Sequence, residues 1–288
     1  MTDETSKSAQ PRVEEVERRV LDHRVHDALR AYHGHYYRDV VGLRDWERRA
    51  TDRLDEERLI GEGVVGHVEE WFGCEFAGMR VLVVGTGTGA EFFTLIDRGA
   101  SVCGVDVSRD AVSIVHLKGR VRGRSTAAVV AAAEALPFPR DWFDFVYCYT
   151  VLEHVADVER AIDEMIRVCR VGGFVFIQTP DYTFPFEGHY KLPLIPFAPR
   201  IAQALYLWLR GRPTRFLKGI NFLTVAKLNR LLWRRNVTTL RAWEPQVMQW
   251  RANGNWLMAW WADTFAVQKH QNILLKKRPD ITSDHAGV

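Results

Sequence analysis

An uninterrupted apolar run that ends in a glycine-rich turn constrains the fold of this chain most strongly. Residues 81–84 read VLVV and are followed directly by GTGTG at 85–89. A short apolar run of this kind is typical of a strand that is buried on both faces of a parallel sheet. Glycines in the turn after it allow positive φ and let a ligand lie against the backbone. The pattern therefore predicts an α/β protein with a ligand site at the end of its first strand.

The alternation of apolar runs and helical stretches continues along the chain. We predict strands at 102–105, 129–131, 143–149 and 174–178, and a helix at 157–170 that stops at Gly172 and Gly173. A helix at 225–235 and strands at 237–243 and 273–276 follow. This order predicts right-handed βαβ units in a doubly wound, Rossmann-like, mostly parallel seven-stranded sheet with helices on both faces.

These patterns divide the chain into six segments. We expect a disordered tail at 1–10, an N-terminal helical segment at 11–72 and a sheet core that carries the glycine turn at 73–180. A proline-rich and aromatic insertion at 181–223 contains an apolar helix at 201–209. The sheet domain is expected to resume at 224–278, and a second tail to occupy 279–288.

Composition excludes several classes of protein. The chain has 288 residues and is 47% hydrophobic, which suits one large α/β domain or two small ones and excludes disorder throughout. Its four cysteines form no CxxC pair, so neither a disulfide framework nor a thiolate zinc site is predicted. We expect neither a signal peptide nor a transmembrane helix, because residues 1–12 are polar and no run of about 18 apolar residues is free of charge or proline. We therefore expect a cytoplasmic protein.

Charge is distributed unevenly along the chain. Residues 181–288 carry 16 basic against 6 acidic side chains, and no carboxylate lies between Glu187 and Glu244. Eleven lysines and arginines fall within that interval. Such a block points to an anionic partner.

A carboxylate follows the second predicted strand. Asp106 ends that strand, where it can accept hydrogen bonds from both hydroxyls of a ribose. Together with the glycine turn it describes a nucleoside-binding crevice. The pattern GxGxxA at 85–90 also satisfies the dinucleotide fingerprint, so these residues leave the nucleoside open, and a plain tight turn with a helix cap is the alternative.

Five ordered motifs give the chain a resemblance to a known family. They are VLVVGTGTG at 81–89, GVDVS at 104–108, AEALPF at 133–138, FDFVYCYTVLEHV at 143–155 and RVCRVGG at 167–173. In this order they resemble the class I S-adenosylmethionine-dependent methyltransferases, specifically the small-molecule branch (type 11) that includes the ubiquinone-biosynthesis enzymes. The resemblance covers about 79–179 closely and extends more weakly towards the C-terminus.

The resemblance implies that the core at 73–180 binds S-adenosylmethionine as its cofactor, that the helical segment at 11–72 is a lid and that the insertion at 181–223 caps the acceptor. It also assigns residues to the cofactor. The assigned residues are Gly85, Thr86, Gly87, Gly89, Asp106, Val107, Ala133, Glu134 and Tyr149. Two positions depart from the family pattern. Val83 stands where an acidic residue is usual, and Ala132 where an aspartate is common, so the methionine amino group and the adenine need other partners.

Two histidines are candidates for a general base, which typically contributes about 10²–10⁴-fold to a rate. His154 follows the fourth strand, and His189 lies in the insertion, at the edge where acceptors bind. We favour His189 and expect Tyr37 and Tyr190 to contact the acceptor as well. No metal site is predicted, because the histidines at 23, 26, 33 and 35 lack suitably spaced carboxylate or thiolate partners.

The basic, apolar C-terminal third allows two interpretations. The helix at 201–209, followed by Arg210, Arg212, Arg215 and Lys218, suits an amphipathic helix lying on an anionic membrane surface. The alternative is a cap that packs on the core and leaves its arginines solvated. Nucleic acid is the less favoured anionic partner, because no RNA-binding motif accompanies the aromatic residues.

We therefore predict an O-methyltransferase that acts on a small-molecule or lipid-linked acceptor, with a sugar hydroxyl of a glycan, glycolipid or secondary metabolite favoured. A quinone or polyprenyl-type lipid is the alternative acceptor. A non-catalytic nucleoside-binding module that docks on membrane or RNA is the alternative from another class. The acceptor, the use of a base, peripheral association with the inner membrane surface and the oligomeric state stay open.

Overall fold

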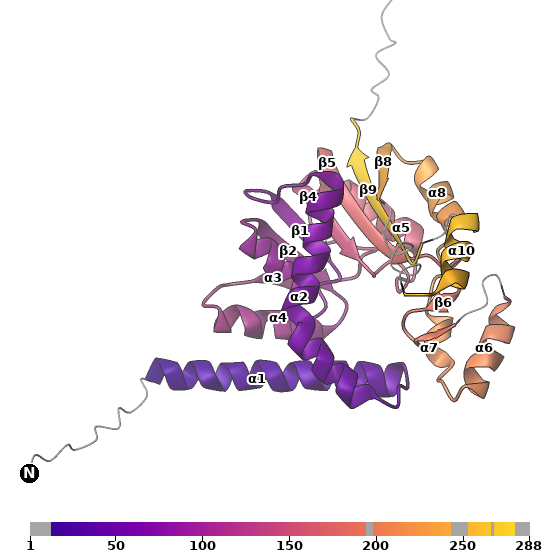
Figure 1. The fold of residues 1–288 in the computed structure, drawn as a ribbon. Coiled ribbons are helices and arrows are strands. Elements are labelled where there is room, and N and C mark those ends of the chain that lie inside the picture. The colour runs from indigo at the N-terminus through magenta and orange to yellow at the C-terminus, as the bar shows by residue number, and fades with distance from the viewer. Residues whose placement is uncertain (1–12, 194–197, 243–252, 266–267, 280–288) are drawn as a thin grey trace, which may run out of the picture.

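The computed structural model describes residues 13–193, 198–242, 253–265 and 268–279 (Figure 1). The tail predicted at 1–10 and all but the first residue of the tail at 279–288 lie outside these residues. Residue 243, the last residue of the strand predicted at 237–243, also lies outside them.

A seven-stranded sheet forms the centre of the molecule. Its strands are β1 (Arg80–Val84), β2 (Ser101–Asp106), β3 (Ala127–Val130), β4 (Phe143–Tyr149), β5 (Cys169–Pro180), β8 (Val237–Ala242) and β9 (His270–Lys277). They lie in the order β3-β2-β1-β4-β5-β9-β8. Strands β1 to β5 pair in parallel, and β9 runs antiparallel to both β5 and β8. The predicted mostly parallel, doubly wound sheet is confirmed.

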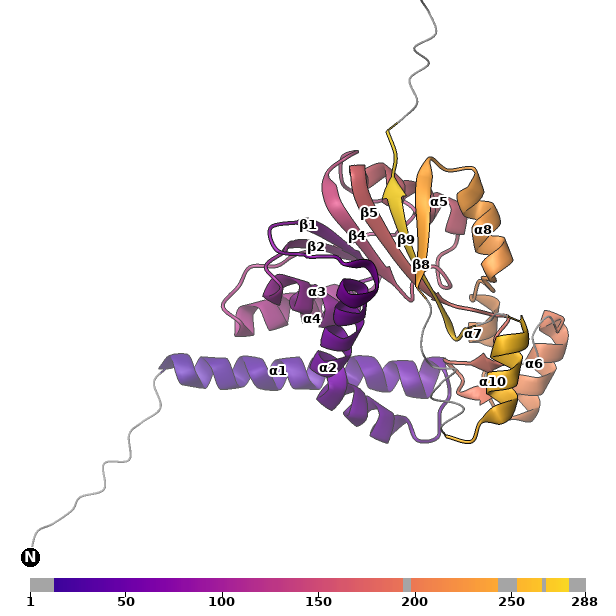
Figure 2. The ribbon, with the colours of Figure 1, turned by 45° about the horizontal axis from the view of Figure 1, so that its top comes forward.

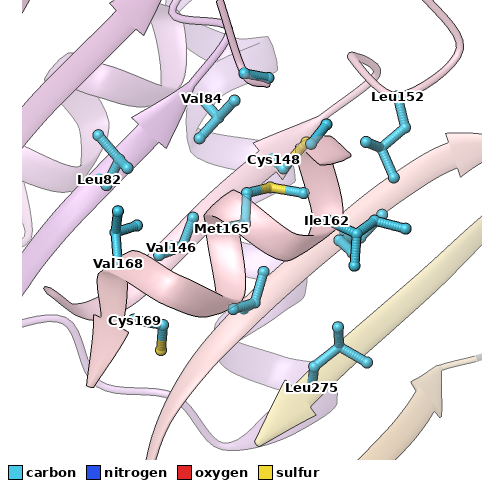
Figure 3. Packing of buried hydrophobic residues seen from close by; sticks show 14 of the residues in the cluster. Leu82, Val84, Val146, Cys148, Leu152, Ile162, Met165, Val168, Cys169 and Leu275 are labelled. Carbon is cyan, nitrogen blue, oxygen red and sulfur yellow. The ribbon is translucent and has the colours of Figure 1, made fainter. Parts of the chain in front are cut away.

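Helices cover both faces of the sheet, because the strands are apolar on both sides. Val81 and Val83 of β1 face α2 (Trp46–Phe72), α3 (Ala90–Asp97) and α4 (Arg109–Val121). Leu82 and Val84, one residue out of phase, face α5 (Val158–Val168) and α8 (Val225–Trp233). Figure 3 shows the second cluster, in which Ile162 and other side chains of α5 point towards the strands. This arrangement confirms the expected three-layer core.

The fifth helix ends earlier than the glycines predict. Helix α5 stops at Val168, and Cys169 already begins β5, opposite Phe143 of β4. Gly173 therefore lies inside the strand, where a Cβ atom would come within 2.8 Å of the carbonyl oxygen of Asp144. The prediction of a helix to residue 170 was wrong, because this glycine serves the close approach of two strands at a register shift rather than a helix cap.

The N-terminal segment contains two long α-helices with a short π-helix between them. Helix α1 (Val13–His35) continues into a π-helix at Tyr36–Val40, and the chain then turns into α2. Helix α1 packs against α4 and α2 and passes beneath the carboxyl ends of the parallel strands (Figures 1 and 2). The helical character of the segment is confirmed, whereas its role as a lid stays a prediction.

The insertion folds beside that turn. It contains β6 (Phe186–Glu187), β7 (Leu192–Pro193), α6 (Arg200–Leu209) and α7 (Arg215–Lys218), so the predicted helix at 201–209 is confirmed. Val41 and Leu43 from the N-terminal turn pack against Tyr190, Leu207 and Leu217 in one buried cluster. Two segments that are far apart in sequence thus meet at the carboxyl edge of the sheet. Among the described residues, no helix combines the length and apolarity that crossing a bilayer requires.

A buried ion pair ties the N-terminal helices to the glycine turn. Lys118 of α4 places its Nζ 2.5 Å from Oε2 of Glu57 on α2 and 2.7 Å from the carbonyl oxygen of Thr88. The hydroxyl of Thr88 donates to the other carboxylate oxygen of Glu57. Both charged side chains are nearly 90% buried. The pair thereby fixes α2 and α4 against the turn that carries the cofactor motif.

Removing one partner of this pair is expected to destabilise the protein. Lys118→Met should lower the free energy of unfolding by about 3–5 kcal/mol, because it leaves the carboxylate of Glu57 buried without its counter-ion. The double variant Glu57→Gln/Lys118→Met should recover most of that loss. Urea unfolding followed by circular dichroism measures both values, and a loss below 1 kcal/mol in the single variant would contradict the prediction.

Candidate active site

A cavity of about 500 Å³ opens at the carboxyl ends of β1, β2 and β4. It lies where the strand order reverses, the position at which doubly wound sheets bind their ligands. Its volume falls in the range of about 300–1,000 Å³ that is usual for small-molecule sites. The lining residues are Tyr32, Val84, Gly85, Gly87, Val105, Asp106, Val107, Ala131, Ala132, Ala133, Glu134, Tyr149, Thr150, Val151, His154, Val155 and Ala156.

The glycine turn forms one wall of the cavity. The backbone N–H groups of Gly85 and Thr86 both donate to the carbonyl oxygen of Val105, which anchors the turn to β2. Gly85 has φ +75°, and a Cβ atom there would lie 2.3 Å from a methyl group of Val151. Gly87 has φ +48°, and a Cβ atom there would meet nothing within 4 Å. The backbone at Gly87 is therefore open to a ligand.

Asp106 joins the turn to the second strand. Its Oδ2 accepts a hydrogen bond from the N–H of Gly87 and its Oδ1 one from the N–H of Ser108, both at 2.8 Å. Each carboxylate oxygen has a second lone pair, so both oxygens can still accept a bond from a ribose hydroxyl. Asp106 thus holds the shape of the turn and offers a diol acceptor to the cavity.

Helix α1 contributes a residue that the sequence did not indicate. Tyr32 lines the cavity close to Ser108 and Asp106. Burial and the nearby charge of Asp106 raise the pKa of Tyr32 to about 12, so the phenol stays protonated and can donate. No local pattern pointed to Tyr32, because the packing of α1 on α4 brings it to the cavity.

The opposite wall is mostly apolar and suits a flat base. Ala133 is buried there, and Glu134 lies beside it with Oε1 accepting from the N–H groups of Ala156 and Asp157. That bond fixes Glu134 against the start of α5 and leaves Oε2 for a ligand. Thr150 has φ +52°, a strained backbone that residues at binding sites often adopt.

The remaining predicted cofactor residues occupy different positions. Val107 and Tyr149 line the cavity. Thr86 is buried beneath the turn with its hydroxyl lacking a partner among the described atoms. Gly89 does not line this cavity and instead caps the N-terminus of α3. The roles of all four towards a cofactor stay predictions.

A cluster of ionisable side chains continues the site from the cavity towards the insertion. His154 lines the cavity, and its ring centre lies 5.0 Å from that of His189. Nδ1 of His189 lies 2.5 Å from Oε1 of Glu187. Glu153 is completely buried beside them and accepts a hydrogen bond from the hydroxyl of Thr179. The fold therefore brings together the two histidines that the sequence proposed and adds Glu153 and Glu187.

Environment shifts the pKa values of these groups in different directions. Burial, together with the positive charge of protonated His189, lowers the pKa of His154 to about 4. Burial tends to lower the pKa of His189, but the hydrogen bond and charge of Glu187 outweigh it and raise that pKa. Burial raises the pKa of Glu153 to about 7. Divergent pKa values in one cleft are typical of functional sites.

The two tyrosines predicted at the acceptor lie in packed surroundings. Tyr190 is fully buried and donates its hydroxyl to the carbonyl oxygen of Pro213. Tyr37 is partly buried and stacks on His33, with ring centres 6.4 Å apart. Neither lines the cavity described above. A contact of either residue with the acceptor stays a prediction, which this packing does not support.

Comparison with known proteins agrees with this site. A family model described as "Methyltransferase domain" matches residues 82–177. A ubiquinone biosynthesis O-methyltransferase of Thiobacillus denitrificans is 35% identical over 171 residues, which cover 54% of this chain and 73% of that protein. An uncharacterized methyltransferase of Mycobacteroides abscessus is 28% identical over 72% of this chain and 79% of that protein. Against several other ubiquinone biosynthesis O-methyltransferases the chain spans only about half of their length, 45% and 56% in two cases.

The fold is shared with solved methyltransferase structures. An S-adenosylmethionine-dependent methyltransferase from Mesorhizobium loti superposes with a TM-score of 0.54 at 18% identity, over 75% of this chain and 98% of that one. The cavity fits the same cofactor, because it combines a diol acceptor, an open glycine backbone and an apolar wall for the adenine. The chain therefore belongs to the class I S-adenosylmethionine-dependent methyltransferases, and S-adenosylmethionine is its cofactor.

Proposed function

We propose that this methyltransferase methylates a hydroxyl oxygen of a small, ring-bearing acceptor. The observation that carries the proposal is the Glu187–His189 pair, which lies next to His154 where the cofactor cavity meets the insertion. When bound, the cofactor supplies an activated methyl group to a nucleophile. A hydroxyl is a weak nucleophile at neutral pH and gains from a group that removes its proton.

The chain's own residues can hold and deprotonate such a hydroxyl. Glu187 binds Nδ1 of His189 and so leaves Nε2 as the ring atom that can accept a proton. Glu187 is itself fixed, because its second oxygen accepts a bond from the backbone N–H of Tyr190. Phe216 packs against both histidines, with ring centres 5.7 Å and 5.3 Å away, and limits access of water.

The surroundings favour a flat acceptor. Tyr182 stacks on Phe222 with ring centres 4.6 Å apart, and Tyr36 packs on Phe216 close to the same cluster. Aromatic surfaces of this kind accommodate a ring by stacking. Relatives named ubiquinone biosynthesis O-methyltransferases methylate oxygen in the formation of a quinone, by that name, which supports a quinol or other phenolic acceptor for this chain. The prediction of a sugar hydroxyl stays a prediction without a structural observation in its favour.

A methyl-tracing experiment tests the proposed function. The purified protein is incubated with methyl-labelled S-adenosylmethionine and, separately, with a hydroquinone lipid fraction and a glycolipid fraction. We expect label in an alkali-stable aryl methyl ether from the first fraction. Label on a sugar ether would favour the other acceptor class, and cofactor binding without transfer to any fraction would favour the non-catalytic module.

The insertion also presents an apolar surface that supports docking on a membrane. Ile201, Leu205, Trp208 and Leu209 form one face of α6 and are between 55% and 85% exposed. Helix α10 (Trp256–Phe265) lies at the same end of the molecule and exposes Trp256, Leu257 and Trp260 (Figures 1 and 2). The exposed Arg210, Arg215 and Lys218 supply positive charge beside it. Such a surface suits an anionic bilayer that delivers a lipid acceptor.

Polar substitution of this face is expected to weaken membrane binding. The double variant Trp208→Ser/Leu209→Ser should sediment at least tenfold less with anionic vesicles, because burial of each such side chain contributes about 1.5–3 kcal/mol. Vesicle sedimentation at low and high salt measures the effect. The matched control is Trp233→Ser, since Trp233 is 87% exposed on α8 and outside this surface. Equal sedimentation of all three proteins would contradict the prediction.

A further inference from the structure

The cluster at the inner end of the cavity has the composition of a metal site. Glu153, His154 and His189 each offer one ligand atom, and these three atoms lie within 4.8 Å of one another. Two imidazoles and one carboxylate form a common ligand set for zinc and related first-row cations in catalytic sites. The three residues come from the segment after β4 and from the loop between β6 and β7, so only the folded chain assembles them.

A buried oxygen in this cluster lacks a partner. Oε1 of Glu153 is inaccessible and has no hydrogen bond among the described atoms, although Oε2 receives one from Thr179 at 3.2 Å. The hydroxyl of Tyr182 is likewise buried without a partner, and it lies close enough to Glu153 and Glu187 to feel their charge. Buried polar atoms normally have hydrogen-bond partners. The two unpartnered oxygens therefore indicate that a ligand or ion binds beside Glu153 and Tyr182.

The balance of charge in the cluster favours a cation. Glu153 and Glu187 are 0% and 2% exposed, so the cluster places two carboxyl groups in the protein interior. A carboxylate is costly to bury unless a cation or hydrogen-bond donors compensate its charge. A divalent ion bound here would supply such compensation.

Glu187 occupies the position of a supporting carboxylate. It binds Nδ1 of His189 at 2.5 Å, which leaves Nε2 as the ring nitrogen that can ligate an ion. A histidine that ligates a metal usually donates its other ring N–H to a carboxylate, which fixes the tautomer and orients the ring. The Glu187–His189 pair already has this arrangement.

We propose that Glu153, His154 and His189 bind a divalent transition-metal ion of the zinc class, supported by Glu187. Zinc–nitrogen and zinc–oxygen bonds of about 2.0–2.2 Å in tetrahedral geometry require ligand atoms roughly 3.4 Å apart. The three atoms must therefore close by at most about 1.4 Å, which rotation of side chains achieves at His154, whose ring faces the open cavity. The fourth position would face the acceptor.

For the role of the ion, this inference rests on the proposed function. A coordinated hydroxyl loses its proton more readily, because the cation stabilises the oxyanion. Its O–H bond would break and the proton would pass to water, while both bonding electrons stay on oxygen. Nε2 of His189 would then be a metal ligand rather than the proton acceptor. A measured affinity for the ion therefore distinguishes the ligand role of His189 from its role as a base.

The test is a titration of the full-length, chelator-treated protein with Zn²⁺ by isothermal calorimetry. We expect one equivalent to bind to the wild type. His154→Ala and His189→Ala should each weaken binding at least 100-fold, and Glu187→Gln should weaken it about 10–100-fold, as supporting carboxylates typically do. His23→Ala is the matched control, because His23 is exposed on α1 and should leave the affinity unchanged.

Calorimetry with S-adenosylhomocysteine on the same samples separates the possible failures. Variants that still bind the nucleoside are folded, so their loss of Zn²⁺ affinity supports the site. If the wild type binds no Zn²⁺, or if the three site variants bind it as tightly as the His23→Ala control, the inference is overturned while the methyltransferase reaction stands. A wild type that binds Zn²⁺ as expected but transfers no methyl group would instead overturn the proposed function.

Discussion

An Asp106→Ala variant is expected to bind S-adenosylmethionine at least 100-fold more weakly than the wild type. The substitution removes a carboxylate that accepts bonds from Gly87 and Ser108 and that faces the cavity with its remaining lone pairs. Hydrogen bonds to a charged group contribute about 1.5–3 kcal/mol each. The loss of two such bonds to a ribose amounts to at least about 3 kcal/mol, which exceeds 100-fold in affinity. Isothermal calorimetry with S-adenosylmethionine and S-adenosylhomocysteine measures the change.

Two further variants interpret that result. Asp55→Ala removes a carboxylate of the same size from an exposed position on α2 and should leave the affinity unchanged. Asp106→Asn keeps one acceptor oxygen and should lose less affinity than the alanine variant. Unaltered binding by a folded Asp106→Ala protein would mean that the cofactor lies elsewhere, and the site described at the carboxyl edge would be wrong.

Gly87→Ala is expected to abolish most cofactor binding while the protein remains folded. The added Cβ atom meets no protein atom within 4 Å, so it projects into the space through which a ligand reaches the backbone. The positive φ adds strain of about 1–2 kcal/mol for a residue with a side chain. We expect an affinity loss of at least tenfold by calorimetry and a fall of a few degrees in the melting temperature.

Neighbouring glycines provide the comparison. Gly85→Ala should instead impair folding, because its Cβ atom would lie 2.3 Å from Val151. Gly66→Ala is the neutral control, since Gly66 lies within helix α2 and a Cβ atom there has free space. If Gly85→Ala and Gly87→Ala had the same effect on melting temperature and binding, the distinction between a packing glycine and a ligand-facing glycine would fail.

The strands of the sheet were readable from short stretches of the chain. The run at 81–84 is wholly apolar, and the run at 143–149 has Asp144 as its one charged residue, because a strand covered by helices on both sides needs no polar face. Element ends were less certain. Gly172 and Gly173 are compatible with a helix C-terminus and also with a close approach of two strands. The pairing of Cys169 with Phe143 shows that they lie in a strand.

The candidate site divides in the same way. The glycine turn and Asp106 follow their strands directly, so their meeting at one sheet edge could be inferred from chain order. Tyr32 reaches the cavity because α1 packs on α4, and no sequence motif around Tyr32 predicts this contact. Glu153 is part of the motif at 143–155, but the sequence does not indicate a functional role for it. Its complete burial and the unpartnered Oε1 became evident only in the structure.

Fold class and cofactor were thus accessible without coordinates, because they depend on periodicity and on motifs whose residues are neighbours along the chain. The ionisable cluster needed the folded chain. Helix α5 and strands β5 and β6 separate His154 from His189 along the chain, and the folded chain places their rings 5.0 Å apart. Long-range packing of this kind sums many weak apolar contacts, none of which leaves a recognisable pattern in the sequence.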